Sequence, residues 1–170
     1  MSGSAPTLFD GARALAEAFD RSFAIARPAA PPTPRDFLTV RIGGDPHAIG
    51  LLDLAELVPL GKLAALPGNP SECLGLAGVR GGAVPVYDLR VLLGYAGGGE
   101  TAPWLAILAS ARVALAFDAV EGFLRLPDDA EGDAATAQRH VRQVLRSGDA
   151  ALPVLDTDSL LAAIRGRADS

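Results

Sequence analysis

Short apolar runs separated by turns rich in glycine and proline constrain the fold of this chain most. The runs occupy residues 37–42, 47–52, 83–89, 104–108, 112–117, 120–126, 141–145 and 151–155. Their length and their β-branched or aliphatic residues are typical of strands, and Gly43-Gly44-Asp45-Pro46 between the first two indicates a hairpin. Further turns are expected at 97–99, 127–129 and 147–149. Many short strands punctuated by glycine and proline predict a mostly β barrel or sandwich rather than βαβ units.

The N-terminal part of the chain has a different pattern. Apolar residues spaced three and four apart in 7–24 predict an amphipathic helix: Leu8, Ala12, Leu15, Phe19 and Phe23. Four prolines in 27–35 then favour an extended linker. We therefore expect residues 1–35 to be an appendage and residues 36–170 to be the domain. The helix is either apolar cover for that domain or a docking element for a partner.

Two short helices are expected inside the domain, at residues 53–57 and 157–165. In the second, Leu160, Leu161 and Ile164 share a face, Asp156 and Asp158 suit the N-terminal end, and Gly166 would end the helix. The polar stretch 128–139 is expected to be a loop.

Composition and charge exclude several classes of protein. Hydrophobic residues make up 49% of the 170 residues, enough for an aliphatic core without a cofactor, whereas aromatics make up only 5%. A net charge of -5 lacks the cations that nucleic-acid binding requires, so no nucleic-acid partner is expected. The single cysteine, Cys73, excludes an intramolecular disulfide and is interpreted as a small packed residue.

No apolar run is long enough for a membrane span, since Arg112 interrupts the longest, at 104–117. The first residues show no basic stretch ahead of an apolar run, so no secretory signal and a cytoplasmic location are expected. No metal or phosphate site is predicted either. His47 and His140 lie apart and are expected to be ordinary surface or edge histidines, and Gly97-Gly98-Gly99 precedes Glu100 rather than a lysine.

The most informative stretch runs from residue 63 to residue 94. It contains Leu66-Pro67-Gly68-Asn69-Pro70, then Gly75-Leu76-Ala77-Gly78-Val79-Arg80-Gly81, then Val84-Pro85-Val86-Tyr87-Asp88-Leu89-Arg90 and Leu92-Leu93-Gly94. In order and spacing it resembles the central signature of the CheW family, LPxxP, GxxNLRG and VIPxxDLR closing on LG. The resemblance extends over about residues 36–164. Two departures, Gly78 in place of the motif's Asn and Gly122-Phe123 in place of an acid and an aliphatic residue, bear on the identity of the partner.

The resemblance implies two intertwined SH3-like β-barrels, with the N-terminal helix and the short C-terminal helix added to them. It also implies a non-enzymatic adaptor that couples methyl-accepting chemoreceptors to a CheA-type histidine kinase, in the cytoplasm at membrane-associated arrays. An accessory CheW-like protein of a dedicated pathway, such as twitching or development, is the alternative. A hydrolase using Asp88, Asp118 and a histidine is a distant one.

Six residues are expected to bind a partner or to shape the interface: Glu56, Gly75, Arg80, Gly81, Asp88 and Arg90. The glycines permit sharp turns or close backbone approach, so that Arg80 projects from a constrained position. Its guanidinium would pair with Glu56 or Asp88, either as a purely structural ion pair or to order a loop that faces a partner. Asp88 and Arg90, two residues apart on an expected strand, would form one charged face.

Overall fold

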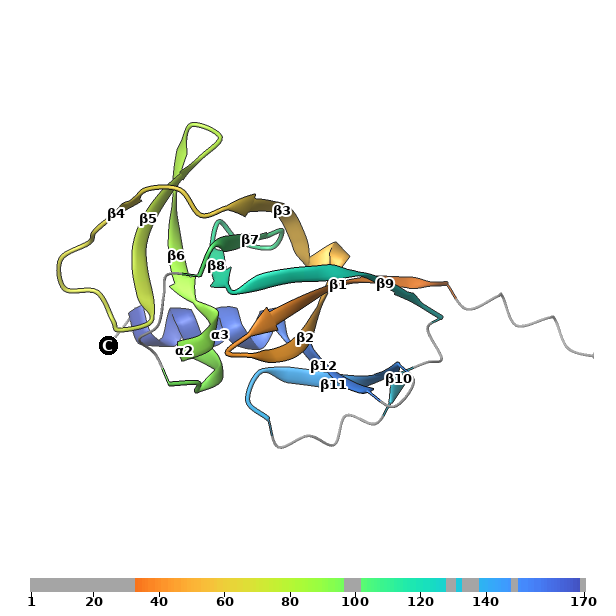
Figure 1. Ribbon diagram of the computed structural model, residues 1–170. Helices are drawn as coiled ribbons and strands as arrows, with labels where there is room; N and C mark the ends of the chain where they lie inside the picture. The colour runs from red at the N-terminus through yellow and green to blue at the C-terminus, as the bar shows by residue number, and fades with distance from the viewer. Residues whose placement is uncertain (1–32, 97–101, 128–130, 133–137, 148–149, 169–170) are drawn as a thin grey trace, which may run out of the picture. The chain divides into compact units, whose positions relative to one another are not determined.

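The strands of the described part of the chain form two six-stranded sheets. The computed structural model describes residues 33–96, 102–127, 131–132, 138–147 and 150–168. The expected N-terminal helix, the linker up to residue 32 and the turn at 97–99 lie outside these ranges, so they stay predictions. The observed fold is mostly β, as expected from the sequence (Figure 1).

The first sheet has the strand order β10-β11-β12-β2-β1-β9. Its strands are β1 (Arg35–Ile42), β2 (Asp45–Gly50), β9 (Ala119–Leu126), β10 (Glu131–Gly132), β11 (Val141–Ser147) and β12 (Ala150–Leu155). Gly43 and Gly44, with φ of 61° and 94°, form the turn between β1 and β2 and bring Ile42 opposite Asp45. Positive φ at both turn positions matches the twist of the strands, which confirms the predicted hairpin.

The second sheet has the order β3-β7-β8-β6-β5-β4. It contains β3 (Leu54–Pro59), β4 (Leu63–Ala64), β5 (Cys73–Val79), β6 (Gly82–Asp88), β7 (Trp104–Leu108) and β8 (Ala114–Phe117). Central strand β8 is parallel to β6, antiparallel to β7 and buried along its whole length. Ala114 and Ala116, two of its four residues, are small enough to let neighbouring layers approach closely.

The chain passes between the sheets twice and then adds a helix. It leaves the first sheet through the 3-10 turn Leu51–Asp53, forms β3–β8, and returns at Asp118, between β8 and β9. Helix α3 (Thr157–Ala168) follows β12 and packs Leu160, Leu161 and Ile164 into a core cluster that also contains Leu38 of β1 and Leu115 of β8. The two sheets therefore share this aliphatic cluster, and each sheet also has a smaller buried cluster of its own, so the core is aliphatic as the composition predicts. No helix in the described ranges has the length and apolar character needed to cross a bilayer.

Three expectations about helices are corrected. Residues 53–57 do not form a helix, because Leu54–Pro59 pairs with β7 and this pairing outweighs the helical preference of the sequence. The strand expected at 83–89 ends at Asp88, where helix α2 (Leu89–Leu93) begins. Helix α3 continues through Gly166, which lies at an open surface and does not end it.

Two further differences concern strands. Strand β5 was not among the predicted runs, because Gly75 and Gly78 lower its apparent strand preference, yet it pairs with β6 along its length. Part of the loop expected at 128–139 is also paired, since Glu131–Gly132 lies opposite Leu145 and Val144 of β11.

Candidate functional site

Arg80 occupies a strained position at the tip of the hairpin between β5 and β6. Val79 pairs with Gly82, so Arg80 and Gly81 form a two-residue turn with φ of 48° and 75°. Glycine adopts such values readily, but a residue with a Cβ pays a conformational cost there. The Arg80 side chain is 78% exposed. The turn thus holds a cation away from the sheet in an orientation fixed by the backbone.

The guanidinium of Arg80 pairs with Glu56 of β3. Its Nε donates a hydrogen bond of 2.7 Å to Oε2 of Glu56, and this bond raises the pKa of Arg80 above its already high value. Strands β3 and β6 are three steps apart in the sheet, which is about 14 Å in a flat sheet. The second sheet must therefore curl, so that its β3 edge approaches the turn between β5 and β6.

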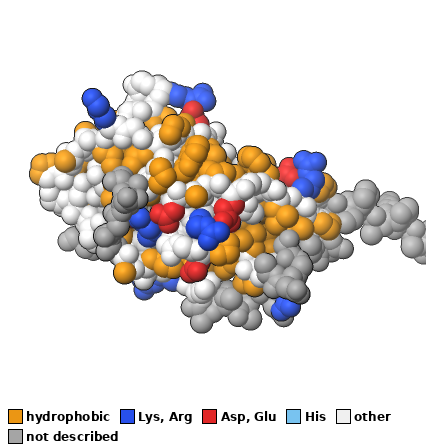
Figure 2. Space-filling model, viewed as in Figure 1, with side chains coloured by type: hydrophobic (Ala, Val, Ile, Leu, Met, Phe, Trp, Pro, Cys, Tyr) orange, Lys and Arg blue, Asp and Glu red, His pale blue; other side chains and the backbone are white. Residues whose placement is uncertain are grey.

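The Glu56–Arg80 pair lies between two surface hollows. One, of about 610 Å³, extends over β3, the end of β7 and the 109–112 bend. The other, of about 280 Å³, lies between β3, its following connection and β5. Both are lined by Glu56, Val79 and Arg80. The larger hollow also has Ser110 and Arg112 and the smaller one Lys62, and the other lining residues are apolar or glycine. Figure 2 shows one face of the molecule, where hydrophobic side chains form a broad band with single and paired charged side chains beside it.

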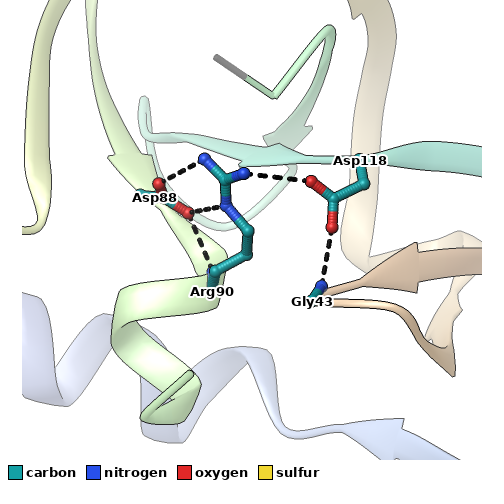
Figure 3. A network of polar contacts seen from close by, with 4 residues as sticks. All are labelled: Gly43, Asp88, Arg90 and Asp118. Atoms are coloured by element: carbon teal, nitrogen blue, oxygen red, sulfur yellow. Dashed lines mark hydrogen bonds and ion pairs between the residues drawn. The ribbon is translucent and has the colours of Figure 1, made fainter. Parts of the chain in front are cut away.

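Asp88 and Arg90 belong to a second polar network, separate from Arg80. Asp88 caps α2 by accepting a 2.9 Å hydrogen bond from the backbone N of Arg90, and it also accepts bonds of 3.0 and 2.8 Å from Nε and Nη2 of that residue (Figure 3). Nη1 of Arg90 reaches Oδ1 of Asp118 at 3.2 Å, and Oδ2 of Asp118 accepts a 2.6 Å bond from the backbone N of Gly43. The network joins β6 and α2 to the β8–β9 junction and to the β1–β2 turn.

Burial indicates a structural role for this network. The side chains of Asp88 and Arg90 are only 6% and 12% exposed. The hydrogen bonds from Asp88 raise the pKa of Arg90, so its charge is retained although most of the side chain is out of water. The expectation that Asp88 and Arg90 share the charged face of one strand is wrong, because Arg90 lies on α2. They meet through the helix cap, and their charges are paired within the molecule.

The two glycines singled out from the sequence serve different ends. Gly75, with φ of 132°, lies where β4 pairs with β5, and a Cβ there would collide with the carbonyl oxygen of Ala64. Gly81 faces open space, so only its positive φ favours glycine. Gly78 also faces open space, without a positive φ, so the backbone does not require glycine at the position that departs from the family motif.

In the part of the chain that the structure describes, neither histidine is hydrogen-bonded to a member of either network. His47 is 3% exposed, with Nδ1 3.1 Å from the carbonyl oxygen of Asp45, and its ring meets Tyr95 edge-on at 6.2 Å. The expectation that His47 is a surface or edge histidine is wrong, because its side chain is buried. Burial lowers its pKa, mainly through desolvation. Within the described residues, no group of three or more His, Cys, Asp or Glu side chains is arranged to hold a metal ion.

A Ser-His-Asp grouping near α3 is a helix cap. Nδ1 of His140 lies 2.8 Å from Oγ of Ser159, but the carboxylate of Asp156 accepts its 3.0 Å bond from the backbone N of Ser159 rather than from the imidazole. The carbonyl of Asp156 also accepts from the backbone N of Leu160. This geometry satisfies the first turn of α3 and does not orient the histidine as a base.

Three residues of these sites were not predicted from the sequence to take part in them. Asp118 and Gly43 join the Arg90 network from distant turns, and Arg112 lines the larger hollow beside Arg80. Asp118 directly follows a buried run, where a charged residue is a signal for a structural contact. Arg112 was read only as an interruption of an apolar run, and its nearness to Arg80 depends on sheet curvature that no local pattern encodes.

Comparison with known proteins decides the family. Residues 36–165 match the CheW-like domain family. The chain belongs to the CheW-like domain family. Members of this family are non-enzymatic scaffold proteins of chemotaxis signalling, so the expectation of a scaffold rather than an enzyme is confirmed.

Two relatives show how far the sequence of this CheW-like chain has diverged from known proteins. It is 30% identical over 98 residues to a probable chemotaxis protein CheW of Rhizobium etli, covering 56% of this chain and 63% of that protein. The match thus spans less than two thirds of the relative's length. The crystal structure of the scaffolding protein TtCheW from Thermoanaerobacter tengcongensis has the same fold, with a TM-score of 0.65 at 17% identity over 72% of this chain and 89% of that one.

Proposed function

We propose that this CheW-like chain is an adaptor that couples methyl-accepting chemoreceptors to a CheA-type histidine kinase. The observation that carries the proposal is the Glu56–Arg80 pair, which holds a strained, exposed cation between two hollows with partly apolar walls. A strained residue persists where the surrounding structure fixes it, and such residues cluster at functional sites. Apolar walls with a polar rim are the usual anatomy of a protein interface.

The proposed mechanism is simultaneous binding. The helical tip of a receptor lies along the hollows beside Arg80, while the homologous regulatory domain of the kinase contacts another face. Several modest interfaces then add up, because each contact raises the effective concentration of the next partner in an array. The curled second sheet supports a barrel on the β3–β8 side, and we infer that the first sheet closes in the same SH3-like way. The complex would assemble in the cytoplasm at membrane-associated arrays.

Arg80 orders the docking surface in this mechanism. Its Nε is held by Glu56, so the planar guanidinium has a fixed direction before the partner arrives. Pre-ordering a long side chain removes part of the entropy cost that binding would otherwise carry. Removing Arg80 then weakens the complex while leaving the domain folded, because an exposed ion pair contributes little to stability.

One observation favours the alternative of an accessory adaptor with its own kinase. Gly78 lines the smaller hollow and faces open space, so the departure from the motif's Asn changes the surface offered to a partner and not the backbone. Phe123, the other departure, is exposed on β9. A dedicated pathway, such as twitching or development, would supply a partner matched to these positions.

Affinity purification of the tagged full chain from its own cells tests the proposal. We expect a CheA-type kinase and a chemoreceptor to co-purify, and the identity of the kinase distinguishes the main chemotaxis pathway from a dedicated one. The Arg80→Ala variant, purified in parallel, should recover less receptor. Recovery of neither a histidine kinase nor a receptor by the wild-type chain would contradict the proposal.

A further inference from the structure

The larger hollow contains a second cation, Arg112, which makes no ion pair or hydrogen bond with any residue that the structure describes. We propose that Arg112 is a specificity-determining residue of the docking surface, and that it selects a receptor segment in which a carboxylate lies beside apolar side chains. This inference rests on the proposed function and deepens it, because it names the chemistry that the partner must offer. Arg112 lies in the bend between β7 and β8 and lines the same hollow as Arg80.

The guanidinium of Arg112 lies against the backbone of the β5–β6 hairpin. A Cβ built on Gly82 would collide with Nη2 of Arg112, so the guanidinium lies directly over this glycine, next to the Arg80 turn. The absence of a side chain at Gly82 is what makes room for it. The position of Arg112 therefore depends on the same hairpin that positions Arg80.

The hydrogen-bond donors of both arginines are largely unused. Among the described residues Arg112 takes part in no ion pair or hydrogen bond, and Arg80 uses only its Nε, with Glu56. Glu56 is the one acid among the described residues that line the hollow, and Arg80 already pairs with it. The hollow is thus locally positive on a chain whose net charge is -5. A guanidinium with free donors pairs best with a carboxylate, through two parallel hydrogen bonds.

The walls of the hollow indicate which side chains the partner must offer beside the carboxylate. They are formed largely by Val79, Val84, Ile107, Leu108, Ala109 and Ala111. Apolar walls favour an apolar stripe, and on a helix a carboxylate three or four residues from an apolar anchor lies on the same side. The occupant that satisfies both features is a helical receptor segment with an acidic residue at the edge of its apolar face. A ligand that offered only phosphate groups would leave these apolar walls exposed to water.

Titration of the full chain with the cytoplasmic fragment of a chemoreceptor from the same genome tests this inference. The variants are Arg112→Ala and Arg112→Glu, and the matched control is Arg146→Glu, an exposed arginine on β11 of the other sheet. We expect the dissociation constant to rise about two- to fivefold for Arg112→Ala, the range for an exposed ion pair. Charge reversal should weaken binding on the order of tenfold because it adds repulsion. Arg146→Glu should bind like wild type.

Two further readouts separate charge from folding. Raising the salt concentration should weaken the wild-type complex more than the Arg112→Ala complex, because only the former contains the screened pair. Replacing the responsible acid of the receptor fragment by lysine should restore binding to Arg112→Glu, and thermal melting verifies that each variant is folded. If Arg112→Ala misfolds, Arg112→Gln takes its place.

The outcomes separate this inference from the proposed function. Folded Arg112 variants that bind the fragment as tightly as wild type would overturn the inference and leave the adaptor function standing. The same holds if no acid of the fragment shows charge-reversal rescue. A wild-type chain that binds no receptor fragment would overturn the proposed function, and the inference with it.

Discussion

Nη1 of Arg90 lies 3.2 Å from Oδ1 of Asp118, and this contact ties helix α2 to the point where the chain returns from the second sheet to the first. Because Asp118 also accepts a hydrogen bond from the β1–β2 turn at Gly43, one side chain connects three segments that are distant in sequence. The contact is built inside the molecule, whereas the Glu56–Arg80 pair lies at its surface. Substitution of Arg90 should therefore reduce the stability of the domain, whereas substitution of Arg80 should reduce partner binding.

Arg90→Ala is expected to destabilise the domain. It leaves the buried carboxylate of Asp88 without its charged partner, and breaking such a pair costs about 3 kcal/mol. Arg125→Ala is the control, since Arg125 is 72% exposed in its pair with Asp36 and its loss should change stability far less. Urea denaturation of both variants measures the difference. Equal losses for the two would contradict the structural role of the Arg90 network.

Gly75 and Gly78, on the same strand, should differ in their tolerance of alanine. Gly75→Ala places a Cβ against the carbonyl of Ala64 at a positive φ and should cost about 2 kcal/mol or more. Gly78→Ala enters open space and should change stability by about 0.5 kcal/mol or less. Thermal melting of the pair checks this. A similar loss of thermal stability in both variants would contradict the predicted difference between the two positions.

Local patterns predicted the strands better than the contacts between them. The apolar run at 104–108 coincides with β7, and the glycine pair at 43–44 is the predicted turn. Helix α2 was missed because its apolar residues continue the run of β6, and only Asp88, a capping residue two positions before Arg90, marks the change. The expected helix at 53–57 is wrong because pairing with β7, about fifty residues later, decides its conformation.

The candidate site was predicted in part, for the same physical reason. Arg80 between glycine-rich positions indicated a constrained cation, and Glu56 was one of its two expected partners. The sequence could not choose between Glu56 and Asp88, because the choice depends on how the second sheet curls. Nor could it place Arg112 in the same hollow, since that proximity comes from the packing of two separate hairpins.

His47 should make stability depend on pH in the mildly acidic range. Desolvation lowers its pKa in the folded protein, whereas the unfolded chain titrates near 6.5. The unfolded state then binds more protons, so the free energy of unfolding should fall as pH drops below about 6.5. Glu72, whose pKa is lowered by Arg167, acts in a separate window, losing its contribution only below its unfolded value of 4.5.

Urea denaturation at pH 7.5 and 5.5 measures this dependence. His47→Asn should reduce the loss between the two pH values. His140→Asn should remove a further part, because burial also lowers the pKa of His140. The interpretation fails if His47→Asn loses as much stability on acidification as the wild-type chain.

Deletion of residues 1–35 should leave a folded domain. The proline-rich segment separates the N-terminal stretch in the sequence, and the deletion removes only the first residue of β1, Arg35, from the sheets. Circular dichroism and a cooperative thermal transition of the truncated chain would report this. An insoluble or unfolded product would show that the N-terminal stretch contributes essential core contacts.

The most direct test of the adaptor account is kinase activity in a reconstituted complex of receptor membranes, the CheA-type kinase and this chain, comparing wild type with Arg80→Ala. We predict that Arg80→Ala melts within about 3 °C of wild type, since an exposed ion pair contributes little to stability, yet fails to couple the kinase to the receptor. Full coupling by the variant would contradict the account. A loss of folding as large as that of Arg90→Ala would instead assign Arg80 a structural role.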